Sequence, residues 1–239
     1  MRKAATVQKK AKKSIKKAGN PLVHFHIITL FPESIDAYFK ASMIKRAQED
    51  GLIKISLYNP KDFTESRKER VDRRPYGGGP GMVLSPEPML KAAQMALKKN
   101  TKATVLFFSP SGEGFNADMA KSLAKAGRAT KHILMITGHY EGVDARVSAI
   151  LKAKPVSVGP YVLTGGELPA AIVVDAVSRH VRGVLGDTLS LEENRVSSPV
   201  VYTRPDVLLW KKKKYPVPEV LKSGNHAKID AWKKSQKEG

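Results

Sequence analysis

The sequence predicts an α/β protein built on a mostly parallel sheet with helices on both faces. Short apolar runs of strand character alternate with longer stretches whose apolar residues recur at helical spacing. Glycine- and proline-rich segments follow several of these strand-like runs. Loops at the carboxyl ends of parallel strands bind ligands in such sheets, so we expect the functional residues there. The length of 239 residues suits one medium domain and a smaller one.

Each element is predicted from its local pattern. Apolar runs predict strands at 23–29, 52–58, 104–108 and 133–137, with a short one at Val156. Apolar residues at helical spacing predict helices at 33–50, from Ser85 onward, at 117–126, near 143–152 and at 168–180. Gly51 ends the first helix, and Ser85 caps the second, which has Pro86 in its first turn.

The two ends of the chain differ from its middle. Residues 1–19 hold eight Lys or Arg and no acid, so residues 1–20 are predicted to be a disordered basic tail. This tail is either a solubilising segment or an RNA-binding arm. Residues 21–185 form the main predicted domain, 186–203 an interdomain linker without periodicity, and 204–239 a short, basic, helical C-terminal domain.

The charge balance favours a polyanionic partner. The chain has 42 Lys and Arg against 22 Asp and Glu, a net charge of +20, and nucleic acid fits this field best. A membrane partner is not expected, because the longest apolar stretch is too short to span a bilayer and the N-terminus lacks the apolar core of a signal peptide. The absence of cysteine excludes disulfides and cysteine-based zinc sites, and it agrees with a cytoplasmic location.

Several loops are candidates for ligand binding. Residues 75–82 include three consecutive glycines, but their spacing matches neither a phosphate-binding P-loop nor a dinucleotide fingerprint. Residues 107–112 form a Ser-Pro turn at a strand end, and residues 138–142 offer glycines with the carboxylate of Glu141. Residues 157–169 set backbone donors and acceptors beside apolar residues, which suits an adenine ring. Each of these segments taken singly also fits an ordinary connecting turn.

Two further groups have chemical potential. Arg179 could stabilise a developing oxyanion, and the carboxylates before Asn194 could accept a proton, although such residues are also common on surfaces. His24 and His26 share a strand face and could bind a metal. With no third ligand visible in the sequence, no metal site is predicted there.

Eight segments together resemble the bacterial tRNA (guanine-N1)-methyltransferases, the TrmD type of the SPOUT superfamily. The resemblance covers roughly residues 22 to 232. Each segment is weak alone, but eight in one order are highly specific. They are Leu30–Glu33, Asp62–Thr64, Arg74–Met82, Tyr140–Gly142, Tyr161–Pro169, Gly183–Gly186, Tyr202–Pro205 and Ser223–His226.

The resemblance implies a C-terminal trefoil knot in residues 21–185 that holds S-adenosyl-L-methionine. It further implies a homodimer with a shared RNA site, methylation of guanosine at N1 in tRNA position 37 next to the anticodon, and assistance by Mg²⁺ with no ligands assigned. In this family the C-terminal part carries further helices beyond the position of Trp232. The residues that match cofactor-lining positions are Ser109, Pro110, Gly138, Glu141, Val158, Gly159, Pro160, Tyr161, Val162, Leu163, Gly165, Gly166 and Pro169.

The resemblance also assigns catalytic positions, with one departure. Arg179 matches the family arginine that stabilises negative charge on the guanine, but Asn194 stands where the family has its aspartate base. An amide cannot accept a proton as a carboxylate does. We therefore expect Glu193, or else Glu192, to serve as the base. Two alternatives remain open: a related methyltransferase acting on another RNA, and an RNA-binding homologue of weak or absent activity.

Overall fold

The computed structural model describes residues 20–66, 70–98, 102–125, 129–185 and 198–236. The chain divides between Val184 and Leu185 into two compact units. Glu192, Glu193 and Asn194 lie outside the described residues, as do residues 1–19 of the basic tail.

The first unit is built on a five-stranded sheet in the order β2-β1-β6-β5-β7. Every strand pair in it is parallel, which confirms the predicted sheet type. Val23 lies opposite Ile53 on one side and Lys131 on the other, so the amino ends of three strands are level. The strands are β1 (Val23–Ile28), β2 (Ile53–Tyr58), β5 (Ala103–Gly114), β6 (Lys131–Ile136) and β7 (Lys154–Ser157).

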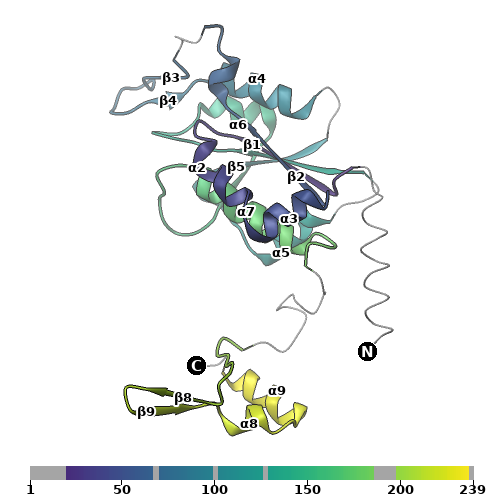
Figure 1. The fold of residues 1–239 in the computed structure, drawn as a ribbon. Helices are drawn as coiled ribbons and strands as arrows, with labels where there is room; N and C mark the ends of the chain where they lie inside the picture. The colour runs from purple at the N-terminus through teal and green to yellow at the C-terminus, as the bar shows by residue number, and fades with distance from the viewer. Residues whose placement is uncertain (1–19, 67–69, 99–101, 126–128, 186–197, 237–239) are drawn as a thin grey trace. The chain divides into compact units, whose positions relative to one another are not determined.

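Helices cover both faces of this sheet, as predicted (Figure 1). One layer contains α2 (Glu33–Phe39), α3 (Ser42–Glu49), α5 (Ala117–Ala124) and α7 (Glu167–His180), and the other contains α4 (Pro86–Leu97) and α6 (Ala145–Leu151). Phe25 packs in the first core and Leu134 in the second, and both are fully buried. Burying a side chain of this size contributes about 1.5–3 kcal/mol, so the two apolar cores fix the strands that carry the loops.

Two elements differ from the prediction. The single helix expected at 33–50 is two helices, because Ala41 is extended and interrupts the helical hydrogen bonds between α2 and α3. Strand β5 continues beyond Phe108 to Gly114, where the sequence predicted a turn. Phe108 and Glu113 both lie opposite Val156, so the residues between them form a bulge. The bulge directs the Ser-Pro segment out of the sheet.

Shorter elements complete the first unit. A 3-10 helix, η1, spans Pro60–Phe63, and a two-stranded ribbon pairs β3 (Asp72–Arg73) with β4 (Val83–Leu84). The glycine-rich loop connects β3 to β4. Gly77, Gly78, Gly79 and Gly81 all have positive φ angles in that loop, a conformation that strains other residues. Glycine is therefore needed there for the backbone path.

The second unit contains more than helices. Strands β8 (Val207–Trp210) and β9 (Lys213–Pro216) form an antiparallel hairpin before α8 (Glu219–Lys222) and α9 (His226–Ser235). The sequence predicted only helix here, which is wrong for the hairpin. Lys211 and Lys212 form its two-residue turn, and both have positive φ angles. Such turns usually have the sequence Asn-Gly, and two lysines give no comparable signal, so the hairpin was not predicted. Within the described ranges no helix is long and apolar enough to cross a membrane.

Candidate functional site

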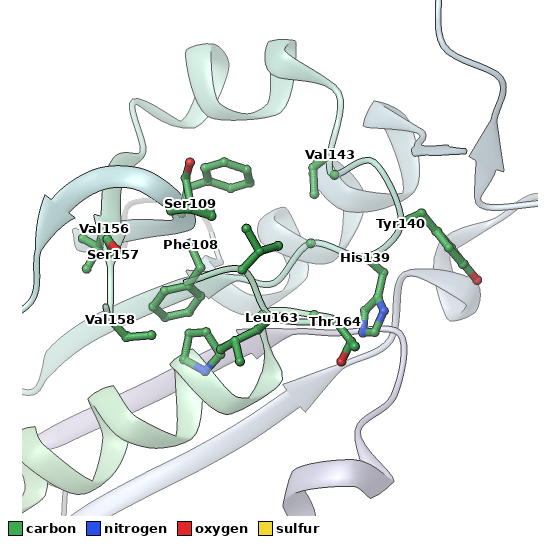
Figure 2. Close-up of a pocket in the computed structure, with 18 of the residues that line it drawn as sticks. Phe108, Ser109, His139, Tyr140, Val143, Val156, Ser157, Val158, Leu163 and Thr164 are labelled. Carbon is green, nitrogen blue, oxygen red and sulfur yellow. The ribbon is translucent and has the colours of Figure 1, made fainter. Parts of the chain in front are cut away.

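A cavity of about 380 Å³ opens at the carboxyl ends of the central strands. Its walls come from the bulge of β5, the loop after β6 and the segment that joins β7 to α7. Figure 2 shows Val156, Ser157 and Val158 along one side and His139 and Val143 on the opposite side. The cavity therefore lies where parallel sheets generally place their ligands.

Most of the residues predicted to bind a cofactor line this cavity. Gly159 and Pro160 are the exceptions. Gly159 packs against the ring of Tyr161. A Cβ atom added to Gly159 would lie only 2.3 Å from the ring carbon Cε1. The predicted residues in the lining are Ser109, Pro110, Gly138, Glu141, Val158, Tyr161, Val162, Leu163, Gly165, Gly166 and Pro169.

The sequence analysis missed part of the lining. Val156 was predicted only as a strand residue, and His139 was not distinguished from the rest of its loop. Figure 2 shows His139 beside Thr164, and an isolated bridge pairs His139 with Gly165. Val143 and Val156 lie outside the candidate loops and were missed, whereas the other lining residues lie in those loops but were not named individually: Phe107, Phe108, His139, Tyr140, Gly142, Ser157 and Thr164.

A buried carboxylate lies behind the cavity wall. The Glu167 side chain begins α7 and is almost fully buried. Its Oε1 accepts hydrogen bonds from Thr29 Oγ1 at 2.5 Å and Thr137 Oγ1 at 3.2 Å. His139 Nε2 donates to Oε2 at 2.7 Å. These bonds tie the ends of β1 and β6 to the start of α7, so Glu167 positions the loop that carries His139.

Replacing Glu167 by glutamine tests this positioning role. Glutamine keeps the shape of the side chain but removes the negative charge, so the charge-assisted hydrogen bonds from His139 and the threonine hydroxyls become weaker neutral ones. We expect the free energy of unfolding to fall by about 1–3 kcal/mol, measured by urea denaturation. Glu87→Gln, which removes an exposed pair with Lys91, should change it by less than about 1 kcal/mol. Equal stability of the two variants would contradict the role of Glu167.

The glycine-rich loop contacts the cavity loop from outside. Glu141 N–H donates to the carbonyl of Met82 at 3.0 Å, and a Cβ atom at Gly81 would come within 2.5 Å of Glu141 Oε1. The glycine-rich loop therefore supports residues 139–143 and is not part of the lining.

Asp144 accepts hydrogen bonds from Arg146 at the start of α6, and these hydrogen bonds lower the pKa of Asp144 to about 2.

Arg179 does not line the cavity. It lies in the last turn of α7, ten residues after Pro169, which corresponds to about 15 Å along a helix axis. Its guanidinium has no ion-pair partner in the described part of the chain. The positions of Glu193 and Asn194 relative to it are not described, so the predicted catalytic set stays a prediction.

His24 and His26 have a neighbour that the sequence did not reveal. His132 on β6 lies beside them, and His26 Nε2 is 3.0 Å from His132 Nδ1. Burial lowers the pKa of His24 to about 4 and that of His26 to about 3. This group lies at the amino ends of the strands and takes no part in the cavity.

Comparisons with known proteins agree on one family. The family model described as "tRNA (Guanine-1)-methyltransferase TrmD" matches residues 23–239. The tRNA (guanine-N(1)-)-methyltransferase of Carboxydothermus hydrogenoformans is 44% identical over 88% of this chain and 81% of its own length. That of Dictyoglomus turgidum is 43% identical over 90% of this chain and 85% of its own. That of Clostridioides difficile is 39% identical over 90% of this chain and 92% of its own length.

Proposed function

Because the chain belongs to the tRNA (guanine-N1)-methyltransferase family of the TrmD type, we propose that it methylates N1 of guanosine 37 in tRNA, next to the anticodon. As a member of this family it is an S-adenosylmethionine-dependent methyltransferase. The cavity at the strand ends is the observation on which the proposal rests. Its lining contains eleven of the residues that match cofactor positions in the family.

The cavity has the character that S-adenosylmethionine requires. Its volume falls within the range of about 300–1,000 Å³ that small-molecule sites occupy. Val158, Leu163 and Pro169 offer apolar surface to an adenine ring. Gly165 and Gly166 bring backbone to the wall with no side chain in between. When bound, the cofactor supplies a methyl group activated by a positively charged sulfur, and the carboxylate of Glu141 offers a charge partner for its cationic groups.

The protein's own contribution concerns the guanine. N1 of guanine carries a proton that must leave before or as the methyl group arrives, and its departure places negative charge on O6. We propose that Arg179 stabilises that charge and that Glu193 accepts the proton in place of the family aspartate. Asn194, at the aspartate position, can donate or accept a hydrogen bond but cannot take the proton.

The position of Arg179 supports a homodimeric site. Arg179 lies about 15 Å along α7 from the lining residue Pro169. It is therefore better placed to contact a guanine held at another subunit's cavity than one held at its own. Leu168 and Ile172, one turn apart on α7, are 60% and 42% exposed. Apolar side chains on one exposed helix face suit a subunit interface. We propose that two copies join through this face.

Two implications of the family stay proposals. We propose that the segment between β7 and α7 is threaded through a trefoil knot. For magnesium, the described lining offers only the carboxylate of Glu141. Glu167, directly behind it, is occupied by its three hydrogen bonds. Magnesium can bind through one or two carboxylates when substrate oxygens and water complete its shell. Glu141 would then be its ligand from this chain, and no step is assigned to that ion.

Methyl transfer to defined tRNA transcripts tests the function. With labelled S-adenosylmethionine, we expect incorporation into a transcript that has guanosine at position 37 and none when that base is replaced. Retained incorporation would favour a related methyltransferase with another target. Cofactor binding without incorporation into either transcript would favour a silent RNA-binding homologue. Mapping the product as N1-methylguanosine identifies the acceptor atom.

The basic tail provides a separate prediction. We propose that residues 1–19 contribute to RNA affinity, since they hold eight positive charges and no acid. Deleting residues 2–19 should weaken tRNA binding and reduce the slope of log affinity against log salt. Filter binding at several salt concentrations measures both. An unchanged affinity and slope would leave the tail with a solubilising role only.

A further inference from the structure

Three histidine side chains meet on one face of the central sheet. His24 and His26 are two apart on β1 and therefore point to the same face, and His132 is the second residue of β6. The strand register places His24 directly opposite His132. The ring centroids are 3.8 Å apart for His24 and His26 and 5.3 Å apart for His26 and His132. The sheet itself thus assembles the group from two strands.

The nitrogen atoms of this group are close enough to share one ion. One nitrogen from each histidine lies within 4.8 Å of the other two, and His26 Nε2 is 3.0 Å from His132 Nδ1. Zinc binds histidine nitrogen at about 2.0–2.1 Å in tetrahedral sites, so two ligand nitrogens on one ion lie roughly 3.3 Å apart. Side-chain rotations that shorten the longest nitrogen-to-nitrogen distance by up to about 1.5 Å would therefore close the set.

Neighbouring hydroxyl groups orient two of the rings. His26 Nδ1 is 3.1 Å from the Tyr58 hydroxyl, and His24 Nε2 is 2.9 Å from the Ser56 hydroxyl. For His26 this contact leaves Nε2 directed at His132. Histidines that bind metals usually have their second nitrogen held by such a partner. The existing hydrogen bonds therefore match the outer contacts of a metal site.

Burial favours the neutral form that metal binding requires. His26 is 2% exposed, and His24 and His132 are half-buried. Burial is the main cause of the lowered pKa of all three. A neutral imidazole has a lone pair for a metal ion, whereas imidazolium has none. The positive charge of Lys54, which lies opposite His24 on β2, acts against a bound cation and limits its affinity.

We propose that His24, His26 and His132 form a binding site for a divalent transition-metal ion, with Zn²⁺ as the ion it takes, and water or a neighbouring hydroxyl as fourth ligand. Imidazole ligands suit zinc and its neighbours and not magnesium. His132 and His139 are seven residues apart, up to about 23 Å of extended chain. The ion would thus cross-link β1 and β6 far from the cavity. Its role is structural, and the proposal does not depend on methyl transfer.

Zinc titration of the untagged full-length protein, stripped with a chelator, tests the site. Calorimetry should show one Zn²⁺ per chain, and the melting temperature should rise with zinc concentration. His132→Gln and His24→Gln should each lower zinc affinity at least tenfold. His226→Gln, at an exposed histidine that begins α9, is the matched control and should bind as the unmodified chain does.

A second measurement separates loss of the site from loss of the fold. Co²⁺ bound by the unmodified chain should give the strong visible absorption of a tetrahedral site, and added Zn²⁺ should remove it. Each variant's urea unfolding in chelator should show that it is folded before its affinity is compared. Absence of stoichiometric zinc binding to the unmodified chain would overturn the proposal. So would unchanged affinity in folded His24→Gln and His132→Gln.

Discussion

Replacing Glu193 by glutamine is expected to lower the rate of tRNA methylation by about 10²–10⁴-fold, the usual contribution of a general base. The affinity for S-adenosylmethionine should stay the same, because Glu193 is not among the residues that match cofactor-lining positions. The physical reason is that the amide cannot take the N1 proton, so the negative charge on guanine never develops fully. Single-turnover methylation and calorimetric titration of the cofactor measure the two quantities separately.

The neighbouring acid provides the matched control. Glu192→Gln makes the same chemical change one residue away and should leave the rate within a few fold of the unmodified chain. Asn194→Asp restores the family residue and should sustain methylation in the Glu193→Gln background. A normal rate for Glu193→Gln would refute its assignment as the base. A large loss confined to Glu192→Gln would transfer the role to that residue.

The cavity could be predicted from the sequence because its residues occur in contiguous loops. Gly138 and Gly165 both stand in segments whose glycines and prolines mark them as ligand-binding, and the resemblance placed them together. The structure shows how they meet: Gly166 N–H donates to the Gly138 carbonyl at 3.0 Å, which joins the loop after β6 to the start of α7. Residues that enter the lining from a strand interior, such as Val156, have no such local signal.

Features that depend on strand register could not be predicted. His132 is more than a hundred residues from His26 in the chain, and only the pairing of β1 with β6 brings them together. The bulge in β5 has the same origin, since it arises from the pairing of Phe108 and Glu113 with one residue of β7. Local periodicity reports which face a residue occupies but not which strand lies beside it. The sequence alone therefore identified His24 and His26 as possible metal ligands but not His132.

Replacing Gly166 by alanine is expected to remove most of the affinity for S-adenosylmethionine, by at least tenfold. An added Cβ atom would lie 2.7 Å from Thr137 Cα and 3.0 Å from the Gly138 nitrogen. Both are backbone atoms of the segment that follows β6, so no side-chain rotation can relieve the clash. The start of α7 must move away from β6 and lose the hydrogen bond to Gly138. Overpacking of this kind costs about 1–3 kcal/mol of folding stability.

Gly114, the last residue of β5, supplies the control for this variant. A Cβ atom there would meet no atom within 4 Å, so Gly114→Ala should keep both stability and cofactor affinity. Calorimetric titration of each variant, under conditions where urea unfolding shows it to be folded, isolates the effect on the cavity. Because Gly166 lines the cavity and directly precedes the buried Glu167, the cavity wall and the fold are coupled at this residue. Full cofactor affinity in a folded Gly166→Ala protein would mean that the cofactor binds elsewhere, and the assignment of this cavity would be wrong.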